Sequence, residues 1–179
     1  MADSVPARTS FIVRLARWRV PLGFVCGVIA VVLSDPTRAS LLAGAVVGVC
    51  GESIRIWAAG HLEKGREVTR SGPYRWTRHP LYAGSSIMGV GLAIASRSAI
   101  VTVLVLAYLS VTIAAAVRTE EAHLTEKFGS EYGAYRQGTA SPVLRRFSAA
   151  RAMRNREYRA ALGFVVVLGI LALRSRGVL

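Results

Sequence analysis

Two apolar runs, at residues 80–96 and 99–117, are separated only by the short polar link around Arg97. Each run falls in the range of about 17 to 25 residues that a membrane-spanning helix needs. So short a link leaves room only for a tight turn, and the second helix must therefore return antiparallel to the first. This hairpin predicts that Arg118, Glu120 and Glu121 lie beside His79 and Tyr82.

Three further apolar runs, at about residues 20–33, 41–60 and 160–173, extend the pattern to about five spans. The hydrophobic share of 53% and the mean hydropathy of +0.41 are high for a soluble protein of this length. The last run has only 14 residues, so it is a short tilted span, or else a re-entrant or interfacial helix. The sequence therefore predicts an all-α, multi-pass transmembrane helical bundle that forms one domain over residues 1–179.

The formal net charge of +13 comes mainly from arginines, and these arginines cluster between the apolar runs. The basic segments are the N-terminus, residues 61–79 and residues 118–159. By the positive-inside rule, the N-terminus and these segments are expected in the cytoplasm. Anionic lipid headgroups are their simplest partners, whereas nucleic acid is not expected. Residues 141–159 also carry apolar side chains, so this segment is predicted to lie on an anionic membrane surface.

Two charged residues interrupt the second apolar run. Glu52 and Arg55 are three residues apart and therefore share one helix face. Charged groups at this depth are costly in lipid, so the pair should face the protein interior or a wet cavity. It is either a structural ion pair or the floor of a polar site beside Trp57.

The fourth run is followed by polar residues that keep a helical pattern. Residues 118–135 are predicted to continue the helix as an amphipathic segment, with Leu124 and Phe128 on its apolar side. Gly129 is expected to break or bend it.

The stretch richest in chemical groups is Gly72-Pro73-Tyr74-Arg75-Trp76-Thr77-Arg78-His79-Pro80-Leu81-Tyr82-Ala83-Gly84. Pro80 suits the first position of a helix, with His79 directly before it, because proline has no N–H group to donate. The unpaired N–H groups of that helix start favour a carboxylate or phosphate, and Arg78 adds positive charge there. An ordinary basic loop anchored by interfacial aromatic residues is the alternative.

The spacing Gly-Pro-Tyr-x-x-x-Arg-His-Pro-x-Tyr-x-Gly, followed by the pair Glu120-Glu121, resembles the isoprenylcysteine carboxyl methyltransferase family, to which phospholipid methyltransferases are related. The resemblance covers about residues 52–135. It implies an integral-membrane enzyme with a cytoplasmic site for S-adenosylmethionine, closed by loops and an amphipathic helix. On this resemblance the expected cofactor-binding residues are Glu67, Val68, Thr69, Tyr74, Arg78, His79, Pro80, Leu81, Tyr82 and Glu120.

Arg118 and Glu121 are the expected catalytic residues. The resemblance implies that an arginine near the acidic pair contacts the substrate, and Arg118 is the nearest one. A glutamate such as Glu121 can remove the proton of an amine acceptor. S-adenosylmethionine needs an anion site for its carboxylate and carboxylates for its ammonium group, and the two ends of the hairpin offer both.

The predicted function is methyl transfer from S-adenosylmethionine to a lipid-like or small hydrophobic acceptor, through a carboxylate, thiol or amine. A site open to lipid would show as an apolar channel that reaches Arg118 and Glu120. No metal site is expected, because Cys26 and Cys50 have no second ligand at a suitable spacing. The alternatives are a membrane NADPH-dependent sterol or enone reductase, and a non-catalytic basic membrane protein that binds anionic lipids.

Overall fold

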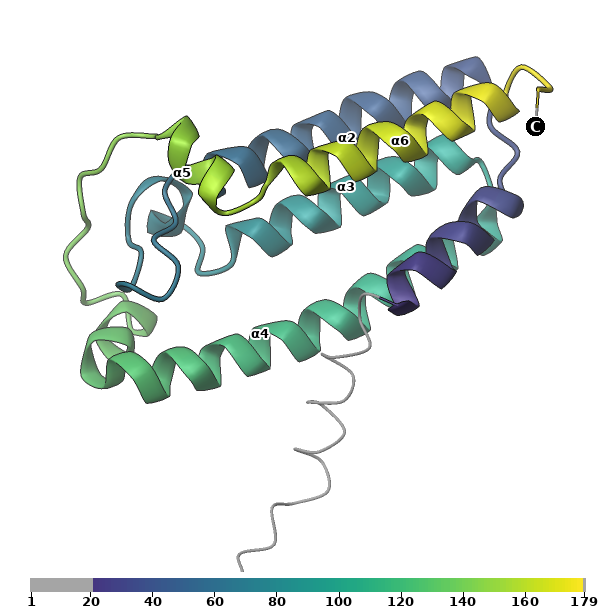
Figure 1. Cartoon of the computed structure of the whole chain (residues 1–179). Coiled ribbons are helices and arrows are strands. Elements are labelled where there is room, and N and C mark those ends of the chain that lie inside the picture. Colours follow the sequence, from purple (N-terminus) through teal and green to yellow (C-terminus); the bar gives the residue numbers. More distant parts are fainter. Residues whose placement is uncertain (1–20, 179) are drawn as a thin grey trace, which may run out of the picture.

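A computed structural model describes residues 21–178, and every regular element in this range is helical (Figure 1). The predicted all-α fold is thereby confirmed for this range. The basic N-terminus expected in the cytoplasm lies outside the described residues. The elements are a first helix at Pro21–Val32, α2 at Arg38–Ala59, the short 3-10 helix η1 at Gly72–Arg75, α3 at Pro80–Ser96, α4 at Ala99–Arg136, α5 at Ala149–Arg154 and α6 at Tyr158–Arg174.

Two of these helices, α2 and α4, are long and apolar enough to cross a membrane. Within the apolar window of each, only 22% of the residues are buried, which differs from the core helix of a soluble protein. The first helix and α3 are shorter apolar helices. These findings favour a membrane location, and the count of five spans stays a prediction.

The helices α2 and α3 pack very closely because glycines of one helix face backbone of the other. A Cβ atom added at Gly91 would lie 2.6 Å from the carbonyl oxygen of Gly44, and one added at Gly51 would lie 2.6 Å from that of Gly84. Small residues at these positions therefore allow the two helices to approach closely. On the other side, the ring of Phe164 brings α6 against α2 at Gly48, so α2, α3 and α6 form one group (Figure 1).

The predicted hairpin is formed by α3 and α4. Arg97 adopts the left-handed conformation that ends α3 (φ 51°), and the hydroxyl of Ser98 caps α4 by accepting a hydrogen bond from the N–H of Val101. Helix α4 then continues past the apolar run and bends at Gly129 (φ 48°, ψ −118°), as predicted. From the turn onwards α4 diverges from α3 (Figure 1).

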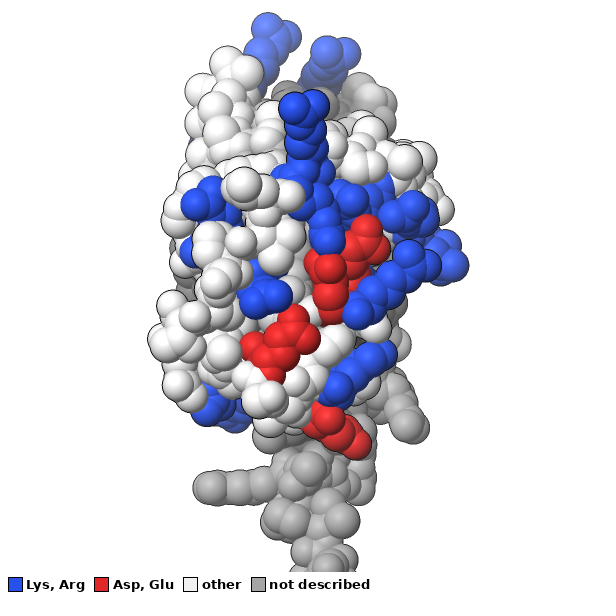
Figure 2. Space-filling model, turned by 90° about the vertical axis from the view of Figure 1, so that its left-hand side faces the viewer, with Lys and Arg blue, Asp and Glu red and all other residues white. Residues whose placement is uncertain are grey.

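The bundle has a turn end and a loop end. At the turn end, the Asp35 N–H donates to the Ser96 carbonyl (2.9 Å), and Arg174 Nε donates to the Ser34 carbonyl (2.7 Å). The loop end gathers the long loop 60–79, the polar half of α4 and the segment before α6. Figure 2 shows the loop end face-on, where Lys and Arg side chains surround a smaller group of acidic side chains.

Candidate active site

The start of α3 has the predicted geometry. Pro80 occupies its first turn, and His79 is the residue directly before the helix, with φ −130° and ψ 55°. The Thr77 hydroxyl accepts a hydrogen bond from the N–H of His79 at 3.3 Å. This arrangement turns the positive end of the helix toward the loop that carries Arg78.

The two ends of the hairpin meet at Glu121. One of its carboxylate oxygens, Oε1, lies 3.1 Å from Arg78 Nη1 and 3.1 Å from His79 Nε2. The hydrogen bond from His79 lowers the pKa of the Glu121 carboxyl below its usual value, and the positive charge of Arg78 lowers it further. Motifs some 40 residues apart are therefore joined directly, which confirms the prediction made from the hairpin.

A cavity of about 540 Å³ opens between the loop, the start of α3 and the polar half of α4. This volume lies within the range of about 300 to 1,000 Å³ that small-molecule sites commonly have. Ten residues singled out by the sequence line this cavity: Glu67, Val68, Thr69, Tyr74, Arg78, His79, Pro80, Leu81, Tyr82 and Glu120.

The loop wall of the cavity is held by internal contacts. The side chains of Val68 and Thr69 are buried, and the Thr69 hydroxyl accepts a hydrogen bond from the N–H of Glu63 at 3.1 Å. Buried His61 lies behind this wall, with its Nδ1 3.1 Å from the Ser71 hydroxyl oxygen. Burial lowers the pKa of His61, as do two neighbouring arginines, so its imidazole is neutral at pH 7.

An aromatic wall faces the loop wall. The Tyr135 hydroxyl donates a hydrogen bond to the carbonyl oxygen of Tyr74 at 2.7 Å and so ties the end of α4 to η1. Burial raises the pKa of Tyr135 to about 12 and raises that of Tyr74 as well. Both phenols therefore stay neutral and can act as hydrogen-bond donors. The rings of Tyr82 and His79 pack with their centroids 5.8 Å apart.

Two polar atoms of cavity-lining residues are buried without a hydrogen-bond partner among the described residues. They are Nδ1 of His79 and the hydroxyl oxygen of Tyr132. Buried polar groups are normally paired, so atoms of this kind at a cavity wall are candidates to contact a ligand.

The two expected catalytic residues do not line the cavity. Glu121 turns instead toward Arg78 and His79. Arg118 is exposed on α4 and forms no ion pair with a described residue.

Buried Glu52 and partly buried Arg55 of α2 form the expected ion pair (3.6 Å), and both lie outside this cavity. The Arg55 guanidinium reaches α6 and α3: it lies 2.7 Å from Glu157 Oε1, 3.3 Å from the Leu81 carbonyl oxygen, and also donates to the Ser85 hydroxyl. The pair therefore supports the helix packing rather than the floor of the site.

A second, mostly apolar cavity of about 330 Å³ lies between the first helix, α3, α4 and α6. Tyr108 and Leu109 belong to its wall, and Arg55 is its charged residue. Neither Arg118 nor Glu120 lines it, so this cavity is not the expected apolar channel to those residues, and that channel stays a prediction.

Sequence reasoning missed several residues of the cavity. His123, Leu124, Phe128, Tyr132 and Tyr135 of α4 line it, as does Lys64 of the loop. The amphipathic pattern places Leu124 and Phe128 on one helix face, and both side chains line the cavity. Tyr132 and Tyr135 line it from beyond the bend at Gly129, which the helical pattern alone does not predict.

Comparison with known proteins assigns the chain to a family. Residues 40–131 match the phospholipid methyltransferase family, which covers just over half of the chain. Over 133 residues the chain is 31% identical to the cobalt-zinc-cadmium resistance protein CzcN of Cupriavidus metallidurans. That alignment covers 70% of this chain and 61% of the relative, so less than two thirds of the relative's length is matched. No solved structure matches the chain. The matched segment also supplies nearly all the residues that line the cavity. This chain therefore belongs to the phospholipid methyltransferase family.

Proposed function

We propose that this protein transfers a methyl group from S-adenosylmethionine, bound in the 540 Å³ cavity, to a lipid-like or small hydrophobic acceptor. Membership of a methyltransferase family supports a methyltransferase activity in general. The observation that carries the more specific proposal is the convergence of ten residues from two distant motifs on one cavity.

The donor groups of the cavity fit this cofactor. Arg78, with the positive end of α3, suits the carboxylate of the methionine part. Glu120 is an exposed carboxylate on the opposite wall, where an ammonium group can bind. Tyr74 and Phe128 offer aromatic surface for an adenine ring. When bound, the cofactor supplies an electrophilic methyl group on its sulfonium.

The residues contribute mainly by holding the two reactants in line. Such alignment can supply a large part of the barrier reduction, about 7 to 11 kcal/mol in favourable cases. Glu121 is proposed to act through Arg78 and His79, whose orientation it fixes. Exposed Arg118, close before the acidic pair on α4, is proposed to meet an anionic acceptor.

The surroundings of the site favour a membrane-bound acceptor. Two candidate membrane helices, α2 and α4, lead to the cavity. The loop end also concentrates arginines, so we propose that it faces the cytoplasm and anionic lipid headgroups (Figure 2). The described residues hold no group of three or more His, Cys, Asp or Glu side chains that could bind a metal ion.

The proposal is tested by binding of S-adenosylmethionine, or of S-adenosylhomocysteine, to the detergent-purified protein in a calorimeter. Saturable binding is expected, and Glu120→Ala should weaken it about tenfold or more, since losing a hydrogen bond to a charged group costs about 1.5 to 3 kcal/mol. Glu126→Ala, an exposed change on the same helix outside the cavity, should bind like the wild type. Binding of NADPH in place of both compounds would support a reductase. Binding of none of them would leave a non-catalytic membrane protein.

The methyl acceptor is found by incubating whole membranes with the purified protein and a donor that carries a radiolabelled methyl group. The label is expected in the lipid fraction or in a small hydrophobic compound. The Glu120→Ala variant serves as the inactive control.

A further inference from the structure

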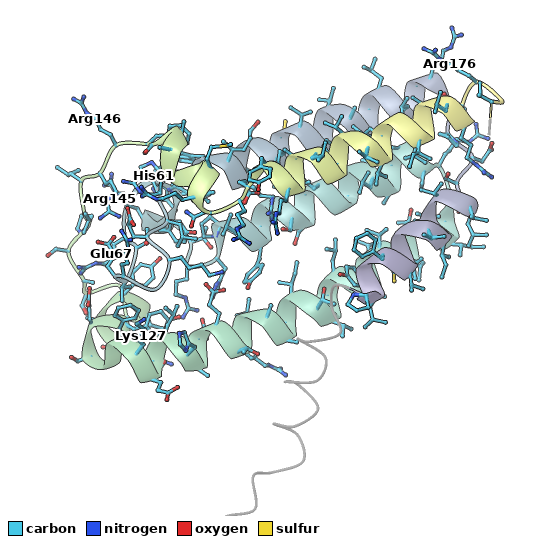
Figure 3. All side chains as sticks on the ribbon, in the orientation of Figure 1. His61, Glu67, Lys127, Arg145, Arg146 and Arg176 are labelled. Atoms are coloured by element: carbon cyan, nitrogen blue, oxygen red, sulfur yellow. The ribbon has the colours of Figure 1, made fainter. Side chains whose placement is uncertain are left out.

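Residues 145–157 follow the family segment, which ends at residue 131, and pass over the loop wall of the cavity. We call them the C-terminal strap. Its first contact is a two-pronged ion pair: Arg145 donates from Nη1 and Nη2 to the two carboxylate oxygens of Glu67, at 2.6 and 2.8 Å. Arg145 Nη1 also lies 3.4 Å from the His61 carbonyl oxygen. Figure 3 shows Arg145 beside Glu67, whereas Arg146 points outward.

The strap also binds the beginning of the loop. Arg151 donates from Nε to Glu63 Oε1 at 2.7 Å and from Nη1 to the Gly60 carbonyl oxygen at 2.5 Å. The side-chain amide of Asn155 donates to the carbonyl oxygens of Ala59 and Leu62, both at 2.9 Å. These groups satisfy carbonyls at and just beyond the end of α2, where positive charge is favourable.

The last residue of the strap reaches the other wall. Glu157 is buried and pairs with Arg55 at 2.7 Å. Arg55 in turn donates to the carbonyl oxygen of Leu81, which lines the cavity in the first turn of α3. One short segment is therefore connected to both the loop wall and the α3 wall of the cavity.

From these contacts we infer that the strap preorganises the cofactor site, with Arg145 and Arg151 as positioning residues that act through Glu67 and Glu63. This inference rests on the proposed function, because it assigns a role in cofactor binding to residues outside the family segment. The loop at residues 61–71 has no regular structure, so ordering it on binding would cost conformational entropy. A loop already held by ion pairs loses less freedom when the ligand binds, and the affinity rises accordingly.

The test compares Arg145→Ala with Arg146→Ala in the full-length protein, by calorimetric binding of S-adenosylhomocysteine. Arg146 is a matched control, since it is the neighbouring arginine and its side chain forms no hydrogen bond or ion pair with a described residue. Arg145→Ala should weaken binding about tenfold, which corresponds to about 1.4 kcal/mol. Arg146→Ala should bind like the wild type. Equal affinities for both variants would overturn the inference.

A double-mutant cycle separates positioning from a general loss of structure. Glu67→Gln alone and Arg145→Ala alone should each weaken binding, and the double variant should lose little more than either single one. In methyl-transfer assays the KM for the donor should rise while kcat is largely kept, and Arg145→Lys should restore part of the affinity. Additive losses, or an equal fall in kcat, would contradict a positioning role.

Hydrogen exchange of the unliganded protein keeps the inference testable even if no S-adenosyl compound binds. Arg145→Ala should raise the exchange of residues 62–69 and leave α2 and α3 unchanged, whereas Arg146→Ala should change neither. Failure of the wild type to bind the cofactor would refute the proposed function alone. Unchanged exchange in Arg145→Ala would refute the strap, whatever the wild type binds.

Discussion

Glu121 is the residue on which the two halves of the site meet, and its charge is the property to test. Glu121→Gln keeps the shape of the side chain but removes the charge that Arg78 and His79 share. Losing about 1 kcal/mol from these contacts should lower the Tm by about 2 to 4 °C at pH 7. Thermal unfolding in detergent, followed by intrinsic fluorescence, measures the effect.

The pH dependence has a fixed sign. The Glu121 pKa is lowered in the folded protein, so its stabilisation is present above the usual pKa of 4.5 and is lost as the pH falls through the lower folded value. The Tm difference between the wild type and Glu121→Gln should therefore shrink as the pH drops below about 4.5. Glu126→Gln, exposed on the same helix, should follow the wild type at every pH. A difference that grows in acid would contradict this role of Glu121.

At the scale of elements, the contact between α2 and α3 depends on the absence of side chains. Gly91→Ala should destabilise the protein by about 1 to 3 kcal/mol, because the new Cβ atom would lie 2.6 Å from the backbone oxygen of Gly44. Gly163→Ala in α6 is the matched control, since its Cβ atom would meet nothing within 4 Å. This control should be neutral or stabilising by up to about 1 kcal/mol, since alanine favours a helix. Chemical or thermal unfolding in detergent compares the two variants.

The elements also show what local sequence could predict. The hairpin was predictable because the link at Arg97 is too short for any other path, and the start of α3 because Pro80 has a strong positional preference. The strap was not predictable, because Arg145 and Glu67 are 78 residues apart and no periodicity relates them.

The sequence predicts that the arginines of residues 141–159 lie on a membrane surface. Arg145 and Arg151 pair with acids of the loop, and the membrane-surface role of the segment stays a prediction. The acids interleaved in that basic loop, Glu63 and Glu67, were the signal that could have pointed to this pairing.

On the scale of the whole molecule, charge and chemistry lie at the same end. The cavity and the strap occupy the loop end, where Lys and Arg side chains gather around acidic ones (Figure 2), whereas Arg97 pairs with Asp35 at the turn end (3.3 Å). The apolar parts of α2 and α4 connect the two ends. If the proposed function holds, this layout lets a water-soluble methyl donor enter at the loop end while an acceptor dissolved in lipid approaches from within the membrane.

This arrangement predicts that the two ends are accessible from opposite sides of the membrane. The test uses the single variants Arg66→Cys in the loop and Asp35→Cys in the turn, each in a chain whose Cys26 and Cys50 are replaced by serine. Both positions suit labelling, because the side chains of Arg66 and Asp35 are 77% and 81% exposed. A maleimide that cannot cross membranes should label the cysteine at position 35 when it is added outside sealed right-side-out vesicles. It should label the cysteine at position 66 only in inverted vesicles, because basic segments stay in the cytoplasm. Labelling of both positions from the same side would show that the helices do not carry the chain across the bilayer. The methyl donor and the acceptor would then have to reach the cavity from the same aqueous face.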